Sequence, residues 1–371
     1  MAHAELGRGG STAQRTLNCP GWAATTLALC GPPGTAPSSP YAEEGTRLHE
    51  VIAAAILRGK PPVDEPKAAR AYFALEEGLH ACGVTIKDVS IEQRVELAGV
   101  PGCFGTADVV FESKRGILHV IDFKFGDGVL VGAEGNDQLQ YYACGVIDTL
   151  YEPGAFRDDE AVMLVIIQPA EGVDDVTSMW RTTVGALRVW KERFANALEQ
   201  DDLRVGSWCR FCPAKAQCPE MRGEVKALIA RPADALLPAD LAEALAQAAE
   251  LESWIDAART YAQQVMEDGI DVPGWKLVAK RAQRKWAQPD SVIMETFRAQ
   301  RLRIDVYAPR TLRSPAALEK ELGKPLPDDL VVKESSGLTI APASDKRLAI
   351  TPTMEKLASN MRQIHERLGN R

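Results

Sequence analysis

The sequence predicts an α/β protein in which a mixed sheet is flanked by helices and followed by a helical and mixed accessory region. Two observations lead to this prediction. Helical periodicity alternates with short apolar strands over the first 170 residues, and an Ala-, Leu- and Glu-rich composition begins beyond residue 222. With 371 residues, 46% of them hydrophobic and 25% charged, the chain is long enough for two globular domains. We therefore expect a core over residues 1–222 and an accessory region over residues 223–371.

Two helices are expected before the first strand. The first covers residues 43–58 and places Leu48, Ile52 and Ile56 on one face. Glycine and proline residues then end it. The second covers residues 66–81 and has a proline at its first turn, a position that tolerates proline well.

The next segments have the sequence pattern of strands. Alternating apolar and polar residues predict strands over residues 89–97, 106–111 and 117–123. A helical pattern follows over residues 137–150, and a short apolar strand covers residues 161–167. The element order is helix, three strands, helix, strand, which is typical of a mixed sheet.

Charge and hydropathy exclude some classes of protein. The 43 basic and 51 acidic residues give a net charge of −8, which argues against nucleic acid coating the whole surface but allows a local basic groove. No apolar run is long enough to span a membrane, and we expect no membrane partner. The first ten residues contain no apolar signal core, so we do not expect secretion.

The most specific stretch of the chain combines two carboxylates with a lysine. Residues 105–108 read G-T-A-D, and residues 120–124 read V-I-D-F-K. Side chains alternate along a strand, so Asp122 and Lys124 point to the same side, and Asp108 on the preceding strand can lie beside them. Two close carboxylates repel each other unless a cation such as Mg²⁺ joins them. A lysine there can orient water or stabilise charge on a phosphate, so the residues suit phosphodiester hydrolysis.

This pattern resembles the active site of the PD-(D/E)XK (restriction-endonuclease-like) nuclease superfamily. The version is similar to RecB-like and AddB-like nuclease domains and to related CRISPR-adaptation nucleases. Three further motifs agree: G-T-R-L-H ending at His49, I-E-Q-R-V-E-L with Glu92, and Q-L-Q-Y-Y from Gln138 to Tyr142. The resemblance covers about residues 11–220 and implies the superfamily's αβββαβ core.

The resemblance implies roles for these residues. Asp108, Asp122 and the main-chain carbonyl of Phe123 would hold Mg²⁺ or Mn²⁺, with His49 and Glu92 completing a catalytic site.

In the same resemblance, Lys124 would activate or position the attacking water, and Gln138 and Tyr142 would position DNA. Ordinary structural roles stay open beside these. Glu96 lies on the same predicted strand face as Glu92 and could be the relevant carboxylate in its place. Gln138 and Tyr142 lie on one face of the predicted helix and could serve packing alone.

Three cysteines are closely spaced. Cys209, Cys212 and Cys218 form C-x2-C-x5-C and need a fourth ligand; Cys19 is the natural candidate, and Cys30 is its rival. The arrangement resembles the iron–sulfur staple of AddB-type nucleases, which implies a 4Fe–4S cluster. A four-cysteine zinc site accepts similar ligands and is the alternative. The other cysteines are expected to be ordinary core or surface residues.

The resemblance implies a metal-dependent deoxyribonuclease that acts as an exonuclease in phage or prophage recombination or replication. DNA would be the substrate, a single-strand annealing recombinase a candidate partner, and the cytoplasm of a bacterial or phage-infected cell the location. The alternative is a non-catalytic DNA-binding or scaffold protein with a nuclease-like fold and a structural cysteine metal site.

The C-terminal third has weaker signals. Residues 275–286 contain five basic and no acidic residues among aromatics, which could grip DNA or simply form a solvated face. The sequence pattern predicts helix over residues 238–266 and a final amphipathic helix over residues 352–368. Between them, we expect loose or strand-like structure over residues 309–342.

Overall fold

The described chain divides into two compact units, Met1–Trp254 and Ile255–Arg371. The computed structural model describes residues 8–32, 40–126, 130–170, 176–229, 238–280, 283–301, 314–327, 329–334, 338–342 and 350. No helix among these residues has the length and apolarity needed to cross a membrane.

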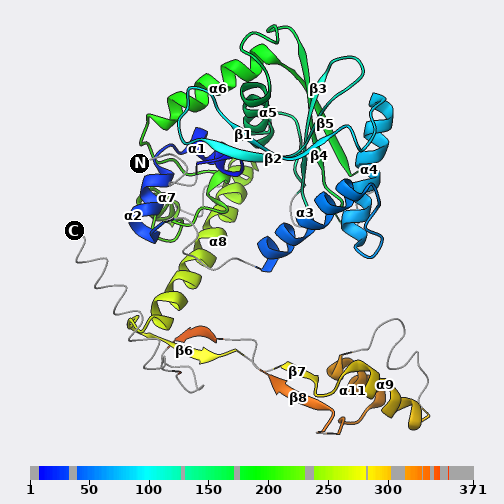
Figure 1. The fold of residues 1–371 in the computed structure, drawn as a ribbon. Coiled ribbons are helices and arrows are strands. Elements are labelled where there is room, and N and C mark those ends of the chain that lie inside the picture. Colours follow the sequence, from blue (N-terminus) through cyan, green and yellow to red (C-terminus); the bar gives the residue numbers. More distant parts are fainter. Residues whose placement is uncertain are drawn as a thin grey trace. The chain divides into compact units, whose positions relative to one another are not determined.

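The first unit is built on a five-stranded sheet with the strand order β1-β2-β3-β4-β5 (Figure 1). The strands are β1 (Ser90–Glu96), β2 (Phe104–Glu112), β3 (Leu118–Phe123), β4 (Ala161–Ile167) and β5 (Thr177–Thr183). The β3–β4 pair is parallel and the other three pairs are antiparallel. The predicted mixed α/β architecture is therefore confirmed.

Helices cover both faces of the sheet (Figure 1). On one face, α3 (Pro40–Arg58) and α4 (Pro66–Cys82) bury apolar residues against Val109 and Phe123. On the other face, α5 (Asp137–Leu150) and α6 (Val184–Leu198) bury apolar residues against Val110 and Val120. All six residues of β3 are buried, as expected of a parallel strand that is covered on both sides.

Helix α5 connects β3 to β4 and carries candidate site residues. The Asn136 side chain caps it by accepting hydrogen bonds from the main-chain nitrogens of Gln138 and Leu139. The bounds of α5 and β4 are those predicted from the sequence. Strand β5 and helix α6, in contrast, were not predicted.

The N-terminal region of the first unit contains three short helical elements. They are η2 (Gly10–Thr12), α1 (Ala13–Asn18) and α2 (Trp22–Cys30). These elements are held by long-range packing, in which Ala13 is fully buried against the α5/α6 face. The unit also contains η3 (Ser207–Cys209) and α7 (Pro219–Ile229).

Helix α8 (Pro238–Glu267) contains the boundary between the units. The second unit pairs β6 (Trp275–Ala279) with β9 (Leu338–Pro342), and β7 (Gln283–Trp286) with β8 (Val331–Glu334). Its helices are α9 (Asp290–Ala299) and α11 (Pro315–Leu322).

A small apolar core with Ile293, Phe297 and Leu318 lies in the second unit. The basic stretch 275–286 thus contributes two strands, β6 and β7, that pair with different partners. The final helix predicted over residues 352–368 lies outside the described residues.

Candidate functional site

A local distortion of the sheet lies where β1 passes β2. Residues Ile91 and Gln93 pair with Val109 and Ala107, which places Glu92 opposite Asp108 in the register. Glu92 has φ = 47°, a left-handed conformation that non-glycine residues rarely adopt. Such strain persists only where the surroundings enforce it, and it is concentrated at functional sites.

The distortion interrupts the alternation of side chains. Ile91 packs on the α3/α4 side whereas Val95, four residues later, packs on the α5/α6 side. In β2, Ala107 and Val109 are likewise divided between the two faces. Regular strands would keep each of these pairs on one face.

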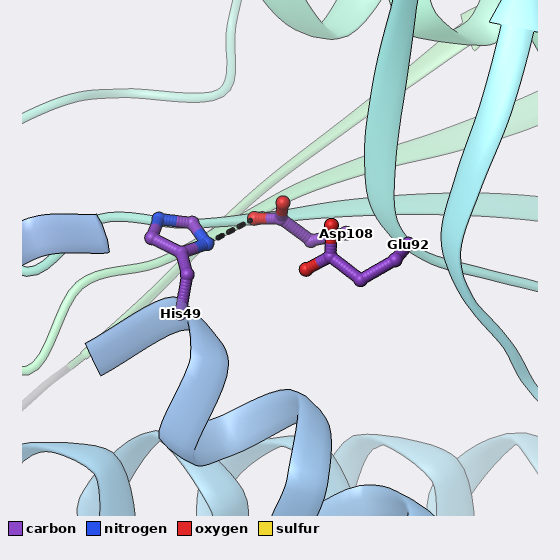
Figure 2. A group of neighbouring side chains, drawn as sticks. All are labelled: His49, Glu92 and Asp108. Atoms are coloured by element: carbon purple, nitrogen blue, oxygen red, sulfur yellow. Dashed lines mark ion pairs between the residues drawn. The ribbon is translucent and has the colours of Figure 1, made fainter. Parts of the chain in front are cut away.

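At this break, Glu92 and Asp108 lie beside His49 from α3 (Figure 2). One ligand atom from each of the three side chains lies within 4.8 Å of the others. His49 Nδ1 is 3.4 Å from Asp108 Oδ2, which also accepts a hydrogen bond from the Phe123 main-chain nitrogen at 2.7 Å. The ring of Phe125 packs edge-on against His49 at 5.2 Å between centroids.

The charges of this cluster perturb one another. Burial lowers the pKa of His49, but the hydrogen bond and charge of Asp108 outweigh burial, so the pKa is raised. Burial and the Asp108 charge raise the pKa of Glu92. A divalent cation would relieve this repulsion, and two carboxylates with an imidazole are suitable ligands for Mn²⁺ and, through their oxygens, Mg²⁺.

A second constellation surrounds Asp122 and Lys124, which lie on the same side of β3 as the alternation predicts. Lys124 Nζ is 2.6 Å from Asp122 Oδ2 and donates to Gln138 Oε1 at 2.8 Å. Gln138 Nε2 donates to Asp122 Oδ1 at 2.9 Å and to Tyr142 Oη at 3.2 Å. The two helix residues thus contact the D-x-K residues directly.

Asp122 is only 2% exposed. Burial raises its pKa to about 6, an effect opposed by Lys124 and reinforced by the charge of Asp108. The buried Oδ2 of Asp122 is paired with the Lys124 ammonium, yet the charge of Asp108 still acts on this carboxylate. Two neighbouring carboxylates are oxygen ligands that a divalent cation can join, so the donor set fits a metal.

The two constellations meet between β2 and β3. Their last paired residues are Val109 and Ile121, so the same register places Asp108 opposite Asp122. The hydrogen bond from the Phe123 nitrogen to Asp108 joins them at the next residue. The group of possible metal ligands contains His49, Glu92 and Asp108, while Asp122 lies in the neighbouring constellation.

The four predicted cluster ligands line one small cavity. Cys19, Cys209, Cys212 and Cys218 come together there from segments far apart in sequence. The Arg204 main-chain nitrogen donates to Cys19 Sγ at 3.4 Å. Burial raises the pKa of the Cys19 thiol, and the neighbouring cysteines reinforce that shift.

The cavity lining distinguishes Cys19 from its rival Cys30. Cys30 is not among the residues that line the cavity, and its thiol donates to the Pro213 carbonyl at 3.5 Å.

Sequence reasoning missed Gln168, which follows β4. Its Nε2 donates to the Gly126 carbonyl at 2.7 Å, and its Oε1 accepts from the Val131 nitrogen at 2.8 Å. It therefore holds the main chain at Gly126, two residues after Lys124, and at Val131. The signal available was a glutamine placed directly after a strongly apolar strand.

A family model described as "Protein of unknown function (DUF2800)" matches residues 67–348, more than half of the chain. The chain belongs to the DUF2800 family. The DUF2800 match includes Glu92, Asp108 and Asp122 but begins after His49 and Cys19. Among solved structures, the chain is similar to "Crystal structure of SSO0001" at 17% identity over 56% of this chain and 84% of that chain. The TM-score is 0.26, too low to support an argument about fold or function.

Replacing Asp122 with asparagine should raise the Tm of the metal-free protein at pH 8, and the gain should shrink toward pH 4. The pKa of Asp122 is about 6 in the native state, against an ordinary value of 3.8. At pH values between these two, Asp122 keeps a proton in the native state that it has lost in the unfolded state. Rising pH therefore destabilises the native state, and asparagine removes this penalty. Thermal unfolding in EDTA at pH 4, 6 and 8 measures the effect. A change in Tm that does not depend on pH would contradict the assignment.

Proposed function

We propose that this protein is a metal-dependent deoxyribonuclease with a PD-(D/E)XK core. The observation that carries the proposal is the convergence of Asp108, Asp122 and Lys124 on neighbouring strands, beside His49 and Glu92. A packing role does not account for three carboxylates, an imidazole and an ammonium gathered in one place, because Asp108 and Asp122 are buried and burying such charges is costly.

The proposed chemistry assigns the metal to His49, Glu92 and Asp108, with Asp122 and the Phe123 carbonyl contributing as the motif implies. A bound Mg²⁺ or Mn²⁺ would supply Lewis acidity to the phosphate and water.

The chain's own groups would do the rest. The Lys124 ammonium, fixed between Asp122 and Gln138, can orient the attacking water and stabilise charge that develops on the phosphate. The Gln138 amide hydrogen-bonds both to that ammonium and to the Asp122 carboxylate. Burial and the nearby Asp122 charge raise the pKa of Tyr142, so its hydroxyl stays protonated and can donate a hydrogen bond to DNA.

The motif resemblance extends the proposal to substrate and setting. We propose DNA as the substrate, exonucleolytic digestion as the mode, and phage or prophage recombination or replication as the process. A single-strand annealing recombinase is the proposed partner.

We also propose that Cys19, Cys209, Cys212 and Cys218 hold a 4Fe–4S cluster. The four residues share one cavity, although they come from segments far apart in the sequence. Thiolate ligands of this kind suit an iron–sulfur cluster. Cys19 fits the fourth position better than Cys30, which lies outside the lining.

Asp108→Asn and Lys124→Met should each reduce DNA cleavage by about 100-fold or more. The asparagine can still accept the hydrogen bond from Phe123, so the change removes charge while keeping that contact. Cleavage of end-labelled linear and circular DNA, with Mg²⁺, Mn²⁺ or EDTA, measures the effect. Asp159→Asn, at a carboxylate whose side chain is 78% exposed, is the matched control and should cleave normally.

Metal-dependent loss of linear DNA alone would support an exonuclease. Cleavage of circles would support an endonuclease at the same site. If protein with a filled cysteine site cleaves neither substrate, the nuclease proposal is wrong, and the nuclease-like fold serves DNA binding or a scaffold.

Anaerobically purified protein should be brown and contain about four iron and four sulfide ions per chain. Cys19→Ser and Cys212→Ser should each lose most of this iron, because each removes a ligand. Cys30→Ser is the control and should retain it. Metal analysis and the visible absorption spectrum give the readout; a colourless protein with one zinc ion per chain would contradict the cluster.

A further inference from the structure

The N-terminal segment, residues 9–18, connects the cysteine cavity with the carboxylate site. Its elements η2 and α1 both pack against α5, and α1 also contacts α6 and η3. Arg15 on α1 donates from Nε to the Trp208 carbonyl at 3.1 Å, and Cys19 directly follows the helix. One end of this segment therefore lies at the cysteines.

The other end of the segment presses against Tyr142. Gly10 is buried, and a Cβ atom added to it would lie 2.5 Å from Tyr142 Cε1 and 2.8 Å from Cζ. A second glycine, Gly105 on β2, approaches the same ring: its added Cβ would lie 2.9 Å from Cε1. Cβ atoms do not approach other heavy atoms this closely in real structures, so the ring position depends on both glycines.

Tyr142 in turn sets the hydrogen bonding of Gln138. Its hydroxyl accepts from Gln138 Nε2, the same nitrogen that donates to Asp122 Oδ1. The opposite end of that amide accepts from Lys124. A shift of the Tyr142 ring would therefore alter the amide that joins Asp122 to Lys124.

We propose that Gly10 is a positioning residue of the carboxylate site and acts through the Tyr142 hydroxyl. The absence of a side chain at Gly10 lets the N-terminal segment hold the Tyr142 ring where its hydroxyl can accept from Gln138. This inference rests on the proposed nuclease function for its catalytic consequence, but its structural part stands on the contacts alone. Because the same segment ends at Cys19, the cysteine site would anchor its far end.

The test is a double-mutant cycle of Gly10→Ala with Tyr142→Phe. In the wild-type background, Gly10→Ala should lower kcat for linear DNA by about tenfold, with KM changed less, because the Gln138 amide loses its fixed geometry. In the Tyr142→Phe background, the same change should alter kcat by less than about twofold, since the hydroxyl that transmits it is already gone.

A second readout does not depend on cleavage. The ¹⁵N side-chain amide signal of Gln138, assigned with Gln138→Ala, should shift in metal-free Gly10→Ala protein. Gly145→Ala is the matched control: it lies on the same helix, and its Cβ would crowd Val95 Cγ2 at 2.7 Å instead of Tyr142. This control should leave the Gln138 signal in place while lowering stability.

Equal losses of kcat in both backgrounds, or an unchanged Gln138 signal in Gly10→Ala, would overturn the proposal. If Gly10→Ala does not fold, Gly105→Ala crowds the same ring atom and is read in the same cycle. If the wild-type protein cleaves no DNA, the proposed function fails, and the Gln138 signal alone decides whether Gly10 positions the site.

Discussion

The burial of the Asp122 carboxylate opposite Asp108 is the constraint on which the site depends. A buried charge is costly unless it is paired, and a second carboxylate nearby raises that cost. Lys124 and the Gln138 amide offset part of it, yet the pKa of Asp122 stays raised. A divalent cation would supply the missing positive charge.

The strained backbone at Glu92 has a consistent explanation in the same site. Its left-handed conformation interrupts side-chain alternation in β1, and together with the change of face in β2 it brings Glu92 and Asp108 beside His49. Strain of this kind costs of order 1–3 kcal/mol and persists where the surrounding structure enforces it. The buried sheet and the packing of α3 against it provide that enforcement.

The sequence predicted the residues of the site better than their arrangement. Strand alternation correctly put Asp122 and Lys124 on one side, because β3 is a regular strand between two covered faces. The same rule fails at Glu92, where a tertiary constraint overrides the local pattern. Strand β5 was missed because its sequence, T-S-M-W-R-T-T, is polar and half exposed at the sheet edge. The approach of Gly10 to Tyr142 joins segments 132 residues apart, so no local pattern could reveal it.

Electron spin-echo spectroscopy of Mn²⁺ bound to the anaerobically purified protein tests most directly whether the carboxylate site is a metal centre. We expect one tight Mn²⁺ site that shows ¹⁴N coupling from an imidazole. His49→Gln should remove the coupling, and Asp108→Asn should weaken Mn²⁺ binding. Absence of tight binding, or ¹⁴N coupling that survives His49→Gln, would contradict the assignment of the carboxylate site as a metal centre.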